Sequence, residues 1–336
     1  MTGRRRYSPA ASGLAVLVVV SLTAVGCGQA VSGDTDEEAA QPADFPYTDK
    51  DNCGVTTTYQ QPPERAVTLT SNATELMLEL GLEDRMVGTG YLKDRDIGKR
   101  YQDAYDEVPV LASGMPSLES VVDTDPDFVY AGYPDGFSES HGHSRERFED
   151  LSINTHLNPE SCGAQPPTFK TLFDEIETVG SIFDVSKQAE NTVQRLRGTL
   201  DDVQEHVGSA DPVNVFVYNS GESSPRTAGG QALLSEIIEQ AGGKNIFADE
   251  DERWFDTSWE QVADREPEVI LIYDYQDPSV GEKKATLRDT SAISAVPAIR
   301  DDRFETIPLS VAQPGPRSVD AVRSLAEELH PDRFGD

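Results

Sequence analysis

Polar and aromatic side chains follow several segments that have the alternation of β-strands. Tyr91, Tyr133, Tyr218 and Tyr275 lie at or just after such segments, and Asn72 follows another. In α/β proteins, ligands bind beyond the carboxyl ends of the strands. We therefore predict that these five residues line a ligand site, although a tyrosine that alternates with core residues, as Tyr218 does, could simply pack.

Three further residues extend this candidate site. Trp254 lies in the loop DERWFD, while Arg226 and Arg317 could each reach ligand oxygens with two hydrogen bonds. Broad aromatic contact with a few hydrogen bonds suits a large, flat or globular chelate. Arg317 could instead pair with an acidic side chain.

The histidines suggest a different chemistry, direct binding of a metal ion. His141 and His143 flank Gly142, and His156 follows 13 residues after His143. Neutral imidazole binds Zn²⁺ well, so the His141/His143 loop could bind Zn or Mn. The second half of the chain adds only His206 and His330, both on predicted helices, which weakens this alternative.

The sequence does not favour an enzyme. The serine in YNSGES lacks the G-x-S-x-G context of a strained nucleophile, and no pair of carboxylates stands out by its spacing. Its double glycines are not followed by the Lys-Ser/Thr of a phosphate-binding loop. We expect no cofactor and no metal held by protein ligands.

The first 27 residues indicate export and lipidation. Arg4–Arg6 precede a short apolar segment, 14–25, which ends in small residues before Cys27. We interpret 1–26 as a lipoprotein signal peptide that makes Cys27 the lipidated first residue, and 27–44 as an acidic flexible tether. An ordinary secretory signal and the twin-arginine route remain alternatives.

Export also affects how the other two cysteines are interpreted. Cys53 and Cys162 would lie in an oxidising compartment, where a disulfide between them is favoured over two free thiols.

The elements that would position the site alternate between strand and helix. This pattern predicts a parallel-sheet α/β lobe at 45–166, a helical segment at 167–210 that contains one long interlobe helix, and a second lobe at 211–336. Ser71 or Asn72 is predicted to cap the first helix, with Glu75 completing a capping box. Strands are predicted at 66–70, 86–90, 127–131, 154–157, 213–218, 269–273 and 303–308.

Six segments, in order, resemble a known family: RAVTLTSNATELMLELGLEDRMVGTGYL, PSLESVVDTDPDFVYAGY, VFVYNSG with PRTAGG, EIIEQAGGKNIFAD, SWEQVADREPEVILIYDY and PGPRSVDAV. They are similar to the ferric-siderophore and cobalamin class of ABC-transporter substrate-binding lipoproteins, over about residues 50–330. The resemblance implies class III architecture, with two lobes joined by one long helix. It also implies a ligand held in the shallow interlobe cleft, which the protein would deliver to a permease.

Two acidic residues gain a role only from this resemblance. Glu119 and Glu239 match the glutamates, one on each lobe, with which the family docks onto arginines of the permease. The family's ligands are ferric siderophores, cobalamin and haem, and we expect a ferric siderophore, whose chelator supplies the iron ligands. A surface adhesin or a sensor subunit with the same fold is a further alternative.

The amino-acid composition limits which classes of partner the protein can bind. The 336 residues include 60 acidic and 28 basic side chains, for a net charge of −32, which argues against a nucleic-acid partner. The acidic surface could favour a neutral or cationic chelate, or it could reflect adaptation to salt. We expect a monomer anchored to membrane lipid through Cys27, either on the outer face of the cytoplasmic membrane or in a periplasm.

Overall fold

The computed structural model describes residues 45–92, 97–163, 166–275 and 277–335, which belong to one compact unit. The predicted signal peptide, the tether and Cys27 lie outside the described residues. None of the helices in these ranges combines the length and the apolar character that a bilayer span needs.

The first lobe is built on a five-stranded parallel sheet with the order β5-β4-β3-β6-β7. The two central strands β3 and β6 have every residue buried, as expected for a parallel sheet covered on both faces. Its strands are β3 Ala66–Leu69, β4 Met86–Gly90, β5 Val110–Ala112, β6 Phe128–Ala131 and β7 Asn154–Leu157, and its helices are α1 Ser71–Glu79, α2 Gln102–Tyr105, α3 Leu118–Val122 and α4 Arg145–Asp150.

An antiparallel hairpin that the strand pattern did not predict precedes this sheet. It pairs β1 (Tyr47–Asn52) with β2 (Val55–Tyr59). The connecting residues Cys53 and Gly54 both have positive φ, 55° and 83°, which is the backbone that a two-residue hairpin turn requires. Cys53 forms a disulfide with Cys162, the pairing expected from the sequence, and thereby ties this turn to the end of the lobe.

The second lobe repeats the plan with a four-stranded parallel sheet, β10-β8-β12-β13, and a small antiparallel pair, β9-β11. Its strands are β8 Val213–Tyr218, β9 Arg226–Ala228, β10 Gly243–Asn245, β11 Trp254–Asp256, β12 Val269–Asp274 and β13 Phe304–Pro308. Its helices are α7 Leu233–Gln240, α8 Trp259–Asp264, α9 Val280–Asp289, α10 Pro297–Arg300, α11 Leu309–Ala312 and α12 Arg317–Leu329.

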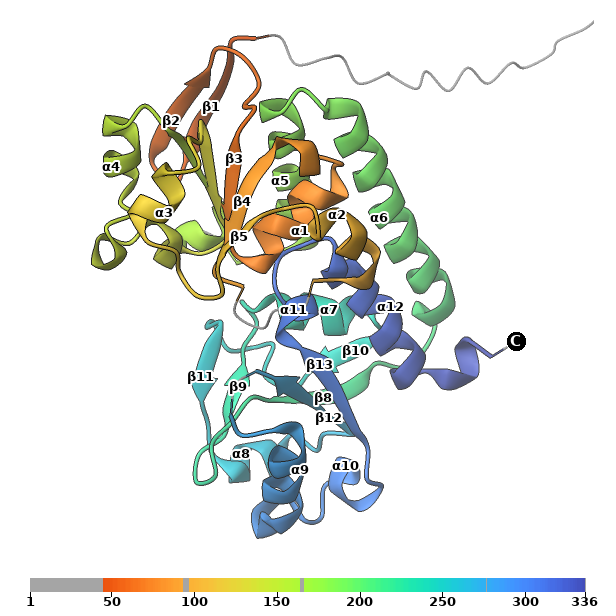
Figure 1. Ribbon diagram of the computed structural model, residues 1–336. Coiled ribbons are helices and arrows are strands. Elements are labelled where there is room, and N and C mark those ends of the chain that lie inside the picture. Colours follow the sequence, from red (N-terminus) through yellow and green to blue (C-terminus); the bar gives the residue numbers. More distant parts are fainter. Residues whose placement is uncertain (1–44, 93–96, 164–165, 276, 336) are drawn as a thin grey trace, which may run out of the picture. The chain divides into compact units, whose positions relative to one another are not determined.

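Two consecutive long helices follow the first lobe, as the periodicity predicts, and the second of them connects the lobes. The helix α5 (Phe169–Ile182) begins with a capping box at Thr168, and the 22-residue α6 (Ser186–Val207) follows it. The second helix runs from α5 to α7 and α12 (Figure 1). These features confirm the architecture of two parallel-sheet lobes joined by one long helix.

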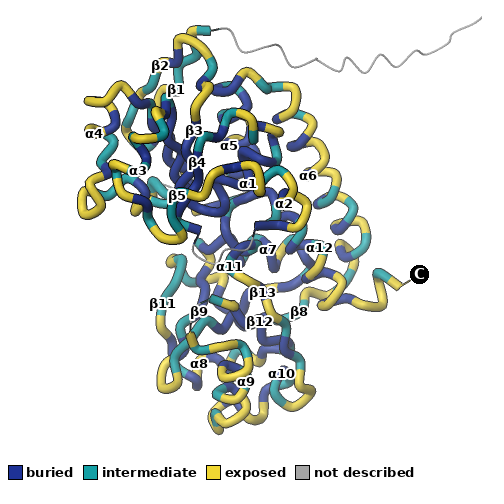
Figure 2. Tube along the Cα trace, in the orientation of Figure 1, coloured by how far each residue is buried: buried dark blue, intermediate teal, exposed yellow. Residues whose placement is uncertain are grey.

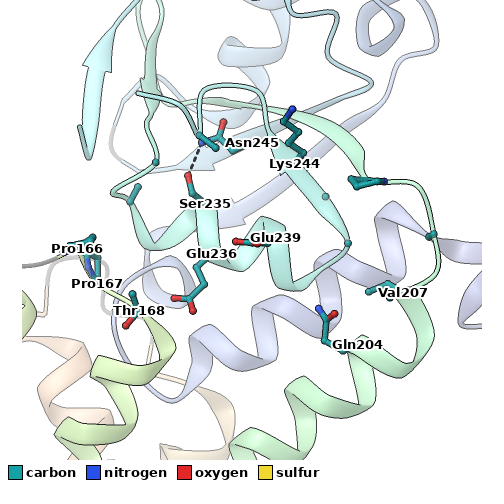
Figure 3. Close-up of a pocket in the computed structure, with 18 residues that line it drawn as sticks. Pro166, Pro167, Thr168, Gln204, Val207, Ser235, Glu236, Glu239, Lys244 and Asn245 are labelled. Atoms are coloured by element: carbon teal, nitrogen blue, oxygen red, sulfur yellow. Dashed lines mark hydrogen bonds between the residues drawn. The ribbon is translucent and has the colours of Figure 1, made fainter. Parts of the chain in front are cut away.

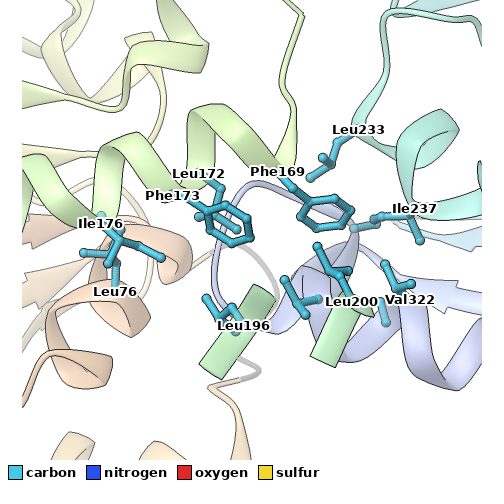
Figure 4. Packing of buried hydrophobic residues seen from close by; sticks show 14 of the residues in the cluster. Leu76, Phe169, Leu172, Phe173, Ile176, Leu196, Leu200, Leu233, Ile237 and Val322 are labelled. Atoms are coloured by element: carbon cyan, nitrogen blue, oxygen red, sulfur yellow. The ribbon is translucent and has the colours of Figure 1, made fainter. Parts of the chain in front are cut away.

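One hydrophobic core continues through both lobes (Figure 4). It joins Leu76 of α1, Ile176 of α5, Leu200 of α6, Ile237 of α7 and Val322 of α12. The strands and the inner helix faces are buried while the outer faces of the helices are exposed (Figure 2). Because apolar contacts rather than water join the lobes through this region, the hydrophobic effect opposes their separation.

Candidate functional site

A cavity of about 260 Å³ lies between the lobes, at the carboxyl ends of strands from both sheets. The first lobe supplies residues that follow β6 and β7, and the second supplies residues from β11, β12 and the segment after β13. Its wall includes Tyr133, Glu160, Arg253, Trp254, Tyr273 and Gln313.

Aromatic rings form the wall on the side of the second lobe. The ring centroids of Trp254 and Tyr273 are 5.0 Å apart, and those of Tyr273 and Tyr275 are 5.9 Å apart. Trp254 comes from the two-stranded pair β9-β11, whereas Tyr273 comes from the central sheet. The rings are tilted against one another, by 32° and 43°, and we call them the aromatic cluster. The cluster can offer an apolar surface to a ligand while other groups supply hydrogen bonds.

Two ionisable side chains, Arg253 and Glu160, line the cavity. The guanidinium of Arg253 donates to the backbone carbonyl of Glu160 at 3.0 Å and so links the lobes. Burial raises the pKa of the Glu160 carboxyl to about 8, although the hydroxyl of Thr171, which donates to it at 2.8 Å, has the opposite effect. At neutral pH this carboxyl is mostly protonated, and Arg253 is the charged group of this pair.

A short segment after α11, Gln313–Arg317, crosses from the second lobe to the first, and we call it the strap. Tyr133 donates its hydroxyl to Gln313, whose side-chain amide donates to the hydroxyl of Ser71 at 3.0 Å. The amide of Asn72 donates to the carbonyl of Pro314 at 3.2 Å. The strap is therefore hydrogen-bonded to Ser71 and Asn72, the first two residues of α1.

These contacts correct the predicted helix cap. The N-cap is Thr70, without a side-chain cap, and neither Ser71 nor Asn72 performs that role. Thr70 has φ 132°, which is rare for a β-branched residue, and its hydroxyl donates to Asn72 at 2.6 Å. Asn72 is thereby committed to Thr70 and the strap, and the structure does not place it among the residues that line the cavity.

Glu75 and Arg317 also have roles that differ from the prediction. Glu75 does not complete a capping box; it accepts hydrogen bonds from the amide of Gly98 at 2.8 Å and from the guanidinium of Arg317 at 2.9 Å. The side chains of Arg317 and Glu75 are only 14% and 2% exposed. Arg317 is therefore part of a buried interlobe ion pair, the alternative left open by the sequence.

The other predicted ligand residues are spread around the cavity. Tyr133 and Trp254 line it, and Tyr275 packs against Tyr273 of its wall. Tyr91, with φ 57°, donates to the carboxylate of Asp135 at 3.3 Å beside that wall.

Tyr218 and Arg226 are not brought into the cavity. Tyr218 is 1% exposed and packs on Trp259 in the core of the second lobe, with ring centroids 5.8 Å apart. Arg226 lies on β9 and pairs with Asp256 on the adjacent strand at 3.4 Å. The side chain of Tyr218 therefore belongs to the core, and that of Arg226 to an ion pair on the small antiparallel sheet.

The histidines do not converge on one point. The rings of His141 and His143 lie 6.4 Å apart in a loop, whereas His156 is buried between Asp49 and Glu175 in the core of the first lobe. Within the described ranges, no group of three or more His, Cys, Asp or Glu side chains could hold a metal ion.

The two glutamates with a proposed docking role are both exposed. Glu119 lies in the first turn of α3, and Glu239 lies on α7. Glu239 lines a separate groove of about 660 Å³ together with Glu236, Gln204 and Lys244 (Figure 3).

Of the wall residues named above, the ligand residues predicted from the sequence did not include Arg253, which precedes the predicted Trp254, nor Glu160, Tyr273 and Gln313. Glu160 follows Pro159 in a 3₁₀ turn beside the disulfide, Tyr273 is the penultimate residue of β12, and Gln313 precedes Pro314. The sequence PGP after Gln313 indicates a loop. Its contact with the first turn of α1 could not be predicted, because that contact depends on tertiary packing.

Comparisons with known proteins agree with this geometry. A family model described as periplasmic binding protein matches residues 67–310. The chain is 24% identical over 330 residues to the ABC transporter substrate-binding lipoprotein YvrC of Bacillus subtilis, which covers 95% of this chain and 97% of that protein.

Two further similarities involve proteins with stated ligands. The cobalamin-binding protein of Halobacterium salinarum is 26% identical over 329 residues, 94% of this chain and 84% of that protein. A crystal structure described as an ABC-type Fe³⁺-hydroxamate transport system from Saccharomonospora viridis is 26% identical, with a TM-score of 0.70, and covers 85% of this chain and 99% of that one.

Proposed function

Because the chain belongs to the periplasmic binding protein family, we propose that it captures a ferric siderophore in the interlobe cavity and delivers it to the permease of an ABC importer. The similar proteins are described as parts of ABC transporters that bind or transport a solute, and none of these descriptions names an enzyme. This agrees with the expectation that the chain is not an enzyme. The fold and the transport class rest on the family, while the identity of the ligand is our proposal.

The observation that carries the choice of ligand is the mixed character of the cavity wall. Arg253, Tyr133 and Gln313 line the same cavity as the adjacent rings of Trp254 and Tyr273. A ferric chelate presents oxygen atoms around its metal and apolar linkers between them, so it can use both kinds of surface. The Fe³⁺-hydroxamate description of the similar Saccharomonospora viridis structure supports this choice.

Cobalamin is the second candidate. The aromatic cluster could contact the face of a corrinoid, and the relative from Halobacterium salinarum is described as cobalamin-binding. A cavity of about 260 Å³ is below the usual range of roughly 300–1,000 Å³ for sites that enclose a drug-sized ligand. Either ligand would therefore extend beyond it, and the larger corrinoid would do so to the greater extent.

Tryptophan fluorescence tests the ligand directly, because Trp254 lines the cavity and Trp259 lies in the core. A soluble fragment spanning residues 39–336 would be titrated with ferric hydroxamate, catecholate and citrate chelates, haemin, cobalamin and Zn²⁺. We expect sub-micromolar quenching by one ferric chelate and none by its iron-free form. Quenching by cobalamin or haemin alone would replace the siderophore with that ligand.

Two arginines provide a matched test of the site. Arg253→Ala removes the guanidinium from the cavity, whereas Arg226→Ala removes one that lies on β9 beside Asp256. A hydrogen bond to a charged group contributes about 1.5–3 kcal/mol, so we expect affinity for the identified ligand to fall by about tenfold or more for Arg253→Ala only. Equal effects of the two changes would argue against the cavity as the site.

Lipid anchoring and docking complete the proposal. We propose that Cys27 carries the lipid that holds the protein at the membrane, and that Glu119 and Glu239 contact the permease. Cys27→Ala should move the protein from the membrane fraction to the soluble fraction without changing ligand affinity. Retention in the membrane fraction would show that another segment anchors the chain.

A further inference from the structure

One lysine of the second lobe is completely buried. Lys283 lies on α9, where it and Leu287 form the buried side of a helix that is otherwise mostly polar. Its ammonium donates to the backbone carbonyl of Tyr273 at 2.6 Å and lies 3.3 Å from that of Tyr275. Lysine is almost never fully buried unless its charge is matched by partners.

Burial of this ammonium carries a cost. Desolvation lowers the pKa of Lys283, and the nearby carboxylate of Asp274, which is exposed, only partly opposes that effect. An apolar side chain at position 283 would pack beside Leu287 without this penalty. The position of the lysine therefore needs an explanation other than the stability of α9.

The two carbonyls belong to a tight turn at the end of β12. The amide of Tyr275 donates to the carbonyl of Tyr273 at 3.1 Å, so three residues close the turn. The same Tyr273 carbonyl accepts from Lys283. The ammonium thus bridges the first and last residues of the turn from the side of α9.

This turn determines where two aromatic rings lie. Tyr273 and Tyr275 are two residues apart, and the turn brings their ring centroids to 5.9 Å. The ring of Trp254, with its centroid 5.0 Å from that of Tyr273, completes the aromatic cluster on the wall of the cavity. A change in the turn would therefore move the aromatic wall.

We propose that Lys283 is a positioning residue of the ligand site: by holding the carbonyls of Tyr273 and Tyr275, it fixes the aromatic cluster against which the ligand packs. This inference rests on the proposed function, because it takes the interlobe cavity as the place where the ligand binds. A compact ammonium with three rotatable donors suits two carbonyls that converge on one point, a geometry that an amide side chain satisfies less well.

The test is made in a Trp259→Phe background, in which Trp254 is the only tryptophan of the sequence. Lys283→Met removes the ammonium and keeps an apolar stem, while Lys284→Met removes the adjacent, partly exposed charge as a matched control. Two quantities are measured: the acrylamide quenching of Trp254 without ligand, and the Kd for the ferric trihydroxamate ferrioxamine B.

We expect Lys283→Met to change the quenching constant of Trp254 by about twofold and to weaken ferrioxamine B binding by about tenfold, as the loss of two hydrogen bonds predicts. Lys284→Met should change neither quantity. A lower melting temperature for Lys283→Met, with unchanged quenching and unchanged Kd, would overturn the inference, because Lys283 would then only stabilise the fold.

A second variant covers the case in which Lys283→Met fails to fold, and the quenching of Trp254 covers the case in which ferrioxamine B does not bind. If Lys283→Met does not fold, Lys283→Gln, which retains a donor, replaces it and should give smaller changes in the same direction; unchanged quenching and Kd in Lys283→Gln would overturn the inference. If the parent protein does not bind ferrioxamine B, the siderophore proposal is in question. The quenching of Trp254 still supports the positioning role when it changes and overturns it when it does not.

Discussion

A buried histidine makes the stability of the first lobe depend on pH. His156 lies with Nδ1 3.2 Å from a carboxylate oxygen of Asp49 and Nε2 3.1 Å from Glu175, whose carboxylate also accepts from Tyr130 at 2.6 Å. Burial by itself lowers the pKa of His156, but the carboxylates of Glu175 and Asp49 outweigh it and raise that pKa to about 9. The imidazole is therefore charged in the folded protein at neutral pH.

The sign and size of the effect follow from this shift. The pKa of His156 rises from its ordinary value of 6.5 to about 9 on folding, so the folded state binds one more proton than the unfolded state between those values. The stabilisation is complete below pH 6.5 and is lost as pH rises through 9. A difference of about 2.5 units at 1.36 kcal/mol per unit corresponds to about 3 kcal/mol.

Urea unfolding of residues 39–336 at pH values from 6 to 9.5 measures this loss. Glu160 titrates in an overlapping range, because burial raises its pKa from 4.5 to about 8, and its raised pKa also makes stability fall as pH rises. The measurement is therefore made in a Glu160→Gln background, which leaves His156 as the main source of the slope.

Two substitutions test the assignment to His156. His156→Gln should abolish most of the decline between pH 6.5 and 9, and Glu175→Gln should shift the decline to lower pH because it removes the largest contribution that raises the pKa. If the decline in His156→Gln equals that in the parent, the source of the pH dependence lies elsewhere and the reasoning fails.

Three other predictions concern the ties within the molecule and its docking. Arg317→Met should lower the free energy of unfolding by about 3 kcal/mol because it removes the guanidinium of a buried ion pair with Glu75, and adding Glu75→Leu should recover much of this loss in urea unfolding; no effect of Arg317→Met would mean that this ion pair does not stabilise the fold. Replacing both disulfide cysteines by serine should cost about 4–5 kcal/mol for a closed loop of 109 residues, and equal urea midpoints would contradict this. Glu119→Arg with Glu239→Arg should abolish uptake by intact cells and leave ligand affinity unchanged; weakened binding would place these residues in the site or the fold.

Much of the fold could be predicted because local sequence determines it. The strand at Val213–Tyr218 and the long helix ending at Val207 lie where alternation and helical spacing place them. Both are long, strongly patterned elements in which burial and periodicity agree. The short β9 and β11 could not be predicted, because three-residue strands carry too little pattern to distinguish them from loops.

The candidate site could be predicted only in outline. Strand ends indicate which residues approach the cavity, and Trp254 and Tyr133 do line it. The sequence could not show that Arg317 belongs to an ion pair with Glu75, because that contact joins residues 242 positions apart. The buried partners of Tyr218 likewise depend on how the second lobe packs.

The ties between the lobes affect how delivery can be controlled. With α6, the strap and one continuous core joining its halves, the molecule has little freedom to change its outline on loading. Empty and loaded copies would then offer nearly the same outer face to a permease, and empty copies would compete for it. Discrimination would have to come from the exposed surface of the cargo itself, so the rate of import should depend on the fraction of copies that are filled as well as on their number.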